Sequence, residues 1–181
     1  DQALGSAYIE AHGTIQAFAE STLVLALTWH KCCKYILGVS LSTGEVAILQ
    51  FDRNFEEAKV IHRVPRPHSN EAWSLAWTPS PYSPDQHPTQ GLYSGGDDSR
   101  LRGIIFTMKP DQNITAATQS AIIGGERGLP GHDAGITAIL PLPLGLQAGQ
   151  DIILTGSYDE YIRVYTLHDH RHDCPNNRPK V

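Results

Sequence analysis

The stretch Leu154-Thr-Gly-Ser-Tyr-Asp-Glu160, which runs directly into Tyr161-Ile-Arg-Val-Tyr-Thr-Leu167, decides the fold of this chain. Its first half is apolar and ends in small residues, a short polar turn follows, and its second half alternates between apolar and polar residues. Such a pattern predicts two antiparallel strands joined by a tight turn. No window of the sequence carries the 3.6-residue stripe of a long amphipathic helix.

The same order of features occurs in two earlier segments. Each segment has an apolar strand, a second strand that ends in small residues, a tight polar turn and a third, alternating strand. The three turns are Ser42-Thr-Gly44, Asp97-Asp-Ser99 and Tyr158-Asp-Glu160. Repeats of this kind predict an all-β chain built from radially repeated, four-stranded sheets, which is the architecture of a β-propeller.

The blade-like segments cover about residues 20–52, 68–107 and 132–167, and we expect residues 168–181 to form an irregular tail. Thr43, Asp98 and Asp159 are equivalent points that lie 55 and 61 residues apart. These spacings exceed the roughly 40–45 residues of a WD-type blade. We expect loop insertions at residues 79–88 and 109–131, which are rich in turn-forming residues, to account for the excess.

The length of the chain points to a partial propeller. A blade cannot bury its two apolar faces alone, and three blades cannot close a ring. The 181 residues therefore predict about three blades of a ring that we expect to have seven, with the other blades outside this sequence. The first residue is Asp1, and the absence of a leader fits a chain that begins part-way through a longer protein.

Composition excludes several classes of protein. The net charge is −5 and the basic residues are scattered, which disfavours direct binding of nucleic acid. No apolar run approaches the roughly 20 residues that cross a bilayer, so we expect no membrane contact. Cys32, Cys33 and Cys174 do not form a zinc-binding spacing, and their reduced state would fit a cytoplasmic protein.

Two histidines stand at a characteristic distance before an aspartate in a turn. His132 precedes Asp159, and His68 precedes Asp98, as in the WD-repeat pattern, where a buried histidine donates a hydrogen bond to the turn aspartate. We interpret both as structural turn pairs, while a direct role in chemistry stays open. The first repeat departs from the pattern because its turn holds Thr43.

Four longer strings carry a closer resemblance. They are His68-Ser-Asn-Glu-Ala-Trp73, Tyr93-Ser-Gly-Gly-Asp-Asp-Ser-Arg-Leu-Arg-Gly103, Gly131-His-Asp-Ala-Gly-Ile-Thr-Ala-Ile139 and Leu154-Thr-Gly-Ser-Tyr-Asp-Glu160. In this order they resemble the family of WD-repeat diphthine methyl ester hydrolases of diphthamide biosynthesis. The similarity covers most of residues 20–167.

The resemblance implies a carboxylic ester hydrolase without a cofactor. Its substrate would be the methyl ester of methylated diphthine, a modified histidine on translation elongation factor 2, so this protein is the expected partner. The alternative is a non-catalytic WD-repeat scaffold that binds other proteins, because propellers host many unrelated functions.

The sequence nominates no catalytic residue by a local motif. It has no Gly-x-Ser-x-Gly elbow and no His-Glu-x-x-His, although the members of a Ser/His/Asp triad could lie far apart. His68 and Asp97 are the candidates for general acid–base work, because the neighbouring Asp97 and Asp98 carboxylates could raise one pKa. The His-rich stretch 168–174 has no closed set of four ligands, and we expect no metal site.

Glu71 and Trp73 are the candidates for substrate binding. Diphthine carries a trimethylammonium group, which Trp73 could meet with its ring and Glu71 with its charge, as in an aromatic cage. The alternative is that Trp73 belongs to the blade core and that Glu71 is solvated.

Overall fold

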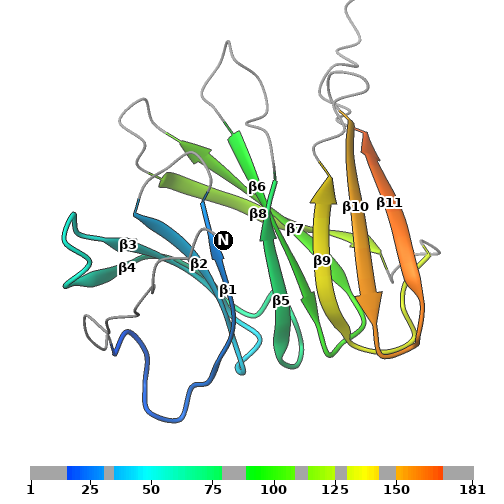
Figure 1. Cartoon of the computed structure of the whole chain (residues 1–181), viewed down its shortest axis with the longest axis horizontal. Helices are drawn as coiled ribbons and strands as arrows, with labels where there is room; N and C mark the ends of the chain where they lie inside the picture. The colour runs from blue at the N-terminus through cyan, green and yellow to red at the C-terminus, as the bar shows by residue number, and fades with distance from the viewer. Residues whose placement is uncertain are drawn as a thin grey trace, which may run out of the picture.

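The computed structural model describes residues 16–30, 35–78, 89–108, 114–124, 130–142 and 150–168, which form eleven strands and no α-helix (Figure 1). The first sheet contains β1 (Val24–Trp29), β2 (Ile36–Leu41), β3 (Val46–Phe51) and β4 (Ala58–Val64). The second contains β5 (Ala72–Trp77), β6 (Thr89–Gly96), β7 (Leu101–Met108) and β8 (Ile114–Gly124). The third contains β9 (Ile136–Leu142), β10 (Gln150–Ser157) and β11 (Ile162–His168).

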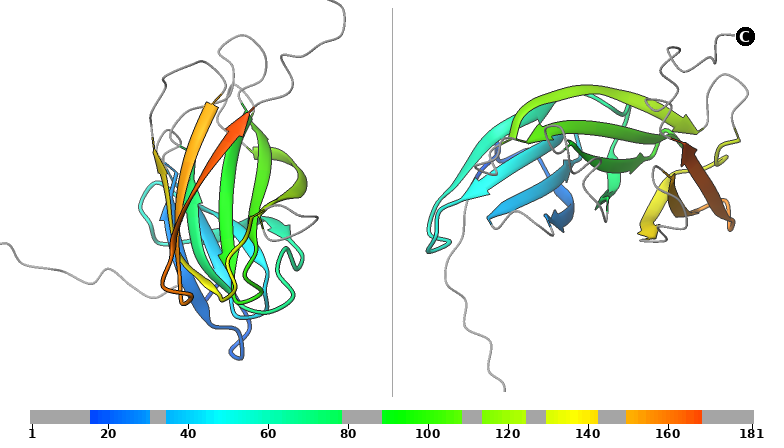
Figure 2. Two further views of the ribbon diagram at one scale, coloured as in Figure 1. Left: turned by 90° about the vertical axis from the view of Figure 1, so that its right-hand side faces the viewer. Right: turned by 90° about the horizontal axis from the view of Figure 1, so that it is seen from above.

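Each sheet is a meander in which every strand pairs antiparallel with the next strand in sequence. The three sheets lie side by side along an arc (Figure 2, right). Their first strands are neighbours, because β5 contacts both β1 and β9. The predicted all-β class is confirmed, and the arrangement of the sheets is propeller-like.

Two apolar layers hold the sheets together. The layer between the first and second sheets contains Ile36, Val46, Ile48, Leu75, Trp77, Leu92, Ile104 and Phe106. The layer between the second and third sheets contains Tyr93, Leu101, Ile136 and Ile153. The second sheet contributes to both layers because successive residues of a strand point to opposite faces. Full burial of each of these large side chains stabilises the fold by about 1.5–3 kcal/mol.

One prediction about a loop was wrong. Residues 109–131, which we expected to be an inserted loop, contain β8, the fourth strand of the second sheet. The strand reads Ile-Thr-Ala-Ala-Thr-Gln-Ser-Ala-Ile-Ile-Gly, and among the described strands it pairs with β7 alone, at the edge of its sheet. An edge strand needs no continuous apolar run, so its small and polar residues resembled a loop. The expected insertion at 79–88 and residues 169–181 of the tail lie outside the described residues.

Candidate functional site

His68 joins three separate segments of the second sheet. It lies before β5, and its Nδ1 is 2.8 Å from Oδ1 of Asp98 in the β6–β7 turn. Its Nε2 is 2.9 Å from Oγ of Ser94 in β6. Asp98 also accepts hydrogen bonds from the backbone N–H groups of Ser69 (3.1 Å) and Arg100 (3.3 Å). The chain segment that leads into β5 is thereby held to the β6–β7 turn.

The charge state of Asp98 follows from these contacts. Burial alone would raise its pKa, but the hydrogen bond and charge of His68 and the two backbone donors outweigh burial and leave the pKa of Asp98 below its usual range. A carboxylate with a lowered pKa is a weak general base at neutral pH. We expected one carboxylate of the Asp97–Asp98 pair to have a raised pKa. The pKa of Asp98 is shifted in the opposite direction.

His132 repeats the arrangement in the third sheet. Its Nδ1 is 2.8 Å from Oδ2 of Asp159, and its Nε2 is 2.7 Å from Oγ1 of Thr155. Asp159 accepts further hydrogen bonds from the N–H groups of Asp133 (3.0 Å) and Tyr161 (3.1 Å). Burial raises the pKa of Asp159, but these donors and His132 outweigh it and lower the pKa to about 2.

Ser94, His68 and Asp98 have the connectivity of a Ser-His-Asp catalytic triad, but not its exposure. A serine nucleophile must reach the carbonyl carbon of a substrate. The exposed fraction of both Ser94 and His68 is 0%. No substrate carbonyl can approach the hydroxyl, so this network stabilises the turn and does not supply a nucleophile.

Asp97 lies in the β6–β7 turn, directly before Asp98 in the sequence. Its Oδ2 accepts a hydrogen bond of 3.0 Å from Nδ2 of Asn70, and its N–H donates to the carbonyl oxygen of Glu71 at 2.9 Å. The structure therefore does not pair Asp97 with His68, whose partner is Asp98. Instead it places Asp97 beside the chain segment that carries Glu71 and Trp73.

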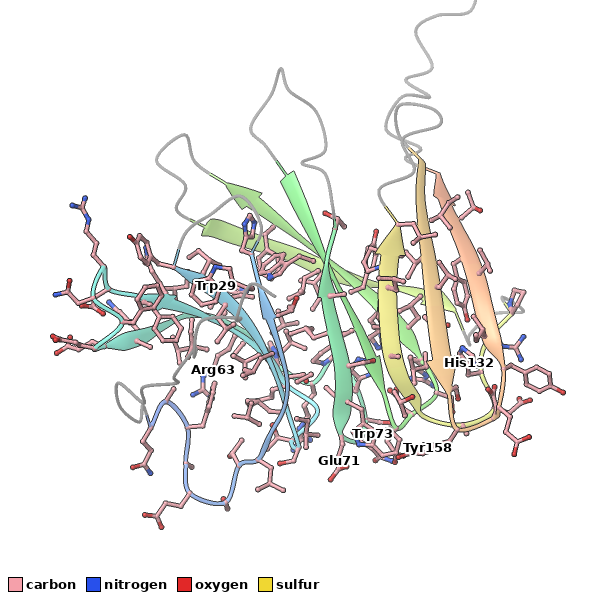
Figure 3. The ribbon with its side chains drawn as sticks, viewed as in Figure 1. Trp29, Arg63, Glu71, Trp73, His132 and Tyr158 are labelled. Atoms are coloured by element: carbon pink, nitrogen blue, oxygen red, sulfur yellow. The ribbon has the colours of Figure 1, made fainter. Side chains whose placement is uncertain are left out.

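Glu71, Trp73 and Tyr158 form a cluster at one end of the second and third sheets (Figure 3). Nε1 of Trp73 donates a hydrogen bond of 2.7 Å to Oε2 of Glu71. The rings of Trp73 and Tyr158 are perpendicular, with centroids 5.3 Å apart. Tyr158 is 70% exposed and Glu71 is exposed, whereas Trp73 is half-buried.

Gly135 sets the orientation of the Trp73 ring. A Cβ atom on Gly135 would overlap Cζ3 of Trp73, so the indole lies directly on the backbone that enters β9. The indole thus lies against the Gly135 backbone, donates its N–H to Glu71 and packs against the ring of Tyr158. Trp73 is neither a fully buried core residue nor a free surface residue.

Sequence analysis did not single out Tyr158 as a binding residue. It is a turn residue 85 positions after Trp73, and the two meet only because the second and third sheets pack together. The cluster combines two aromatic rings and a carboxylate, which are the groups that bind quaternary ammonium ions. Among the described residues, no group of three or more histidines, cysteines and acids could hold a metal ion.

No family model and no curated protein matches the sequence. Among solved structures, the chain is similar to one in the structure of ctPRC2 in complex with H3K27me3 and H3K27M, with 13% identity and a TM-score of 0.49. The match covers 84% of this chain and spans 29% of the other. A similarity at this level transfers no function.

Within the part of the chain that the structure describes, no helix has the length and hydropathy needed to cross a membrane.

Proposed function

We propose that this chain belongs to a WD-repeat propeller that binds methylated diphthine on translation elongation factor 2 and hydrolyses its methyl ester. The observation that carries the proposal is the Glu71–Trp73–Tyr158 cluster. It offers a carboxylate and two aromatic rings to a trimethylammonium group, and diphthine carries such a group. The resemblance of the four sequence strings supplies the ester as the reacting group.

Asp97 is the acid–base candidate that this arrangement favours. His68 is fully buried and therefore out of reach of a substrate. The backbone N–H of Asp97, in contrast, donates to the carbonyl oxygen of Glu71, which places Asp97 next to the cluster. With the ammonium group at the cluster, Asp97 would accept a proton from the attacking water as the water oxygen bonds to the ester carbon. It would then return this proton to the methoxide oxygen as the bond from the ester carbon breaks and methanol leaves. Asn70 would orient the carboxylate through its 3.0 Å hydrogen bond.

The second candidate function is a non-catalytic scaffold that binds a protein bearing a cationic side chain. The burial of both histidine networks favours it, because Ser94 and Thr155 are 0% and 1% exposed and offer no nucleophile. In this case the cluster binds the same ammonium group without turnover.

The two functions are separated by measuring methanol release from the elongation factor, with the substrate verified as the methyl ester. We expect release that depends on the protein and persists in Ser94→Ala, since the Ser94 hydroxyl is inaccessible. Binding of the methylated factor without methanol release would identify the scaffold. Absence of both binding and release would overturn the proposal.

The role of Glu71 is tested with Glu71→Gln. Glutamine keeps an acceptor for Nε1 of Trp73 but removes the negative charge that attracts the ammonium group. We expect KM for the methylated factor to rise by about three- to tenfold with little change in kcat, since an exposed cation site contributes on the order of 1 kcal/mol. Glu160→Gln, in the neighbouring turn, is the matched control and should leave KM unchanged. An unaltered KM in Glu71→Gln would contradict the binding role.

A further inference from the structure

Glu71 and Asp97 stand opposite each other at the end of the β5–β6 pair. The register pairs Ala72 with Gly96, and the N–H of Asp97 donates a hydrogen bond of 2.9 Å to the carbonyl oxygen of Glu71. Residues that stand opposite each other on antiparallel strands have Cβ atoms about 4.5–5.5 Å apart, and two like charges in this arrangement are destabilising. The two carboxylates thus concentrate negative charge beside the aromatic rings of the cluster (Figure 3).

No cationic side chain of the described residues offsets this charge, since the ion pairs among them involve other acids: Glu45, Asp98 and Asp159. Glu71 accepts a hydrogen bond of 2.7 Å from the indole N–H of Trp73. Asp97 accepts one of 3.0 Å from the side-chain amide of Asn70. These neutral donors orient the carboxylates but leave their charge in place. The site therefore presents two negative charges to a ligand that brings one positive charge.

Hydrolysis of the ester changes the charge of the ligand at this site. Water adds to the ester carbon, the bond from that carbon to the methoxide oxygen breaks, and methanol leaves. The acid that forms loses its proton to water at neutral pH, so the reacting group turns from neutral to negative while the ammonium group is unchanged. Because a general base acts through one water, the new carboxylate forms within roughly 6 Å of that of Asp97.

We propose that Glu71 and Asp97 make the site selective for the neutral ester over the negatively charged acid, so that hydrolysis itself weakens binding and releases the product. This inference rests on the proposed function. Both forms offer the same ammonium group, but only the acid adds a charge of the same sign as the two carboxylates. Repulsion between exposed charges at this distance corresponds to about three- to tenfold in a dissociation constant.

The test compares two forms of the elongation factor by calorimetric titration with the full chain. One form carries the free acid. The other carries the primary amide of the same carboxyl group, which is neutral like the ester and hydrolyses much more slowly. We expect the amide to bind about three- to tenfold more tightly than the acid. The ratio of the two dissociation constants should fall toward one as salt is added, because salt screens the repulsion between exposed charges.

Asp97→Asn assigns the selectivity to a residue. It should bring the two dissociation constants to within about twofold of each other, since asparagine does not repel the product carboxylate. Asp133→Asn makes the same change at an exposed acid in the segment that leads into β9, and as the matched control it should keep the ratio of the parent. Thermal unfolding checks that both variants fold, and the salt dependence of the parent tests the repulsion without any substitution.

Three results would overturn the inference. Equal binding of the acid and the amide by the parent would show that the site does not sense the charge of the product, although recognition of the ammonium group would stand. A preference for the amide that Asp97→Asn leaves unaltered would have another origin than this pair of carboxylates. Binding of neither form would remove the proposed function together with the inference.

Discussion

At the scale of single residues, His68 and His132 fix the turns of the second and third sheets. Each ring contacts an aspartate on one nitrogen and a hydroxyl on the other, so one side chain joins three chain segments. Loss of the ring would leave buried polar groups without partners, at a cost of about 1–3 kcal/mol each. These networks are therefore structural, and the chemistry of the site depends on the more exposed groups around Glu71.

The low pKa of Asp159 predicts a dependence of stability on acid. Its pKa falls from the model-compound value of 3.8 to about 2 on folding, so the folded state binds this proton less readily than the unfolded chain. The stabilisation is present above pH ~4 and is lost as pH falls toward ~2. We expect the free energy of unfolding, measured with urea across this range, to decrease.

Asp159→Asn isolates the contribution of this carboxylate. The variant should be less stable than the parent at neutral pH and should lose less stability between pH ~4 and ~2. Asp133→Asn, an exposed acid in the same region whose backbone N–H still reaches Asp159, serves as the control. Equal acid sensitivity of Asp159→Asn and the parent would show that the carboxylate does not act in this way.

At the scale of strands, the distance between the second and third sheets is set by small residues in β5 and β6. Gly95 of β6 lies against Ile136 of β9, and the hydroxyl of Ser74 donates to the Ile136 carbonyl at 3.0 Å. No side chain fits between these strands without displacing one of them. Close approach of β5, β6 and β9 thus depends on a residue without a Cβ atom.

Matched substitutions at equivalent positions measure this effect. Gly95→Ala should lower the free energy of unfolding by about 1–3 kcal/mol, because its methyl group overlaps Ile136 and Ser74. Gly156→Ala should change it by less than about 0.5 kcal/mol in dilute solution, since its methyl group has room. Urea denaturation gives both values. Similar losses in the two variants would mean that contact between sheets is not the cause.

At the scale of the whole molecule, stability comes from the two layers between the three sheets and from a third cluster on the outer face of the first sheet. That cluster contains Val39, Leu41, Ala47 and Leu49. Trp77 is the largest side chain in the first layer, where it contacts Phe106, His30 and the backbone of Thr28. Trp29 has the equivalent position on the outer face of the first sheet, where it is 42% exposed and has Phe51 and Phe55 as ring neighbours. Tryptophans at equivalent positions of two sheets thus contribute different amounts to the free energy of unfolding.

This difference predicts unequal effects of two tryptophan substitutions. Trp77→Ala should lower the free energy of unfolding of the dilute chain by about 3–5 kcal/mol, because it leaves a cavity between sheets. Trp29→Ala should lower it by about 1 kcal/mol or less, since solvent already reaches the ring. Chemical denaturation of both variants checks this, and a reversed order would contradict the packing.

Features that depend on local chemistry could be predicted from the sequence. Alternating strands, tight polar turns and the spacing of His68 before Asp98 predicted an all-β chain of repeated sheets, because strand pairing and turn formation involve residues close in sequence. It failed at β8, where an edge strand of small residues lacks an apolar pattern. It paired His68 with Asp98 and His132 with Asp159, as the structure does, but it could not show whether Asp97 also lies beside His68.

Contacts between the sheets could be seen only in the three-dimensional structure. Trp73 and Tyr158 meet across two sheets, Asp97 turns toward Asn70 and away from His68, and the Ser94 hydroxyl is sealed from solvent. The structure also shows that Trp77 is 3% exposed and Trp29 is 42% exposed, although both belong to the same repeat pattern. The physical reason is that exposure and contacts between sheets depend on which face meets a neighbour, and residues far apart in sequence set that contact.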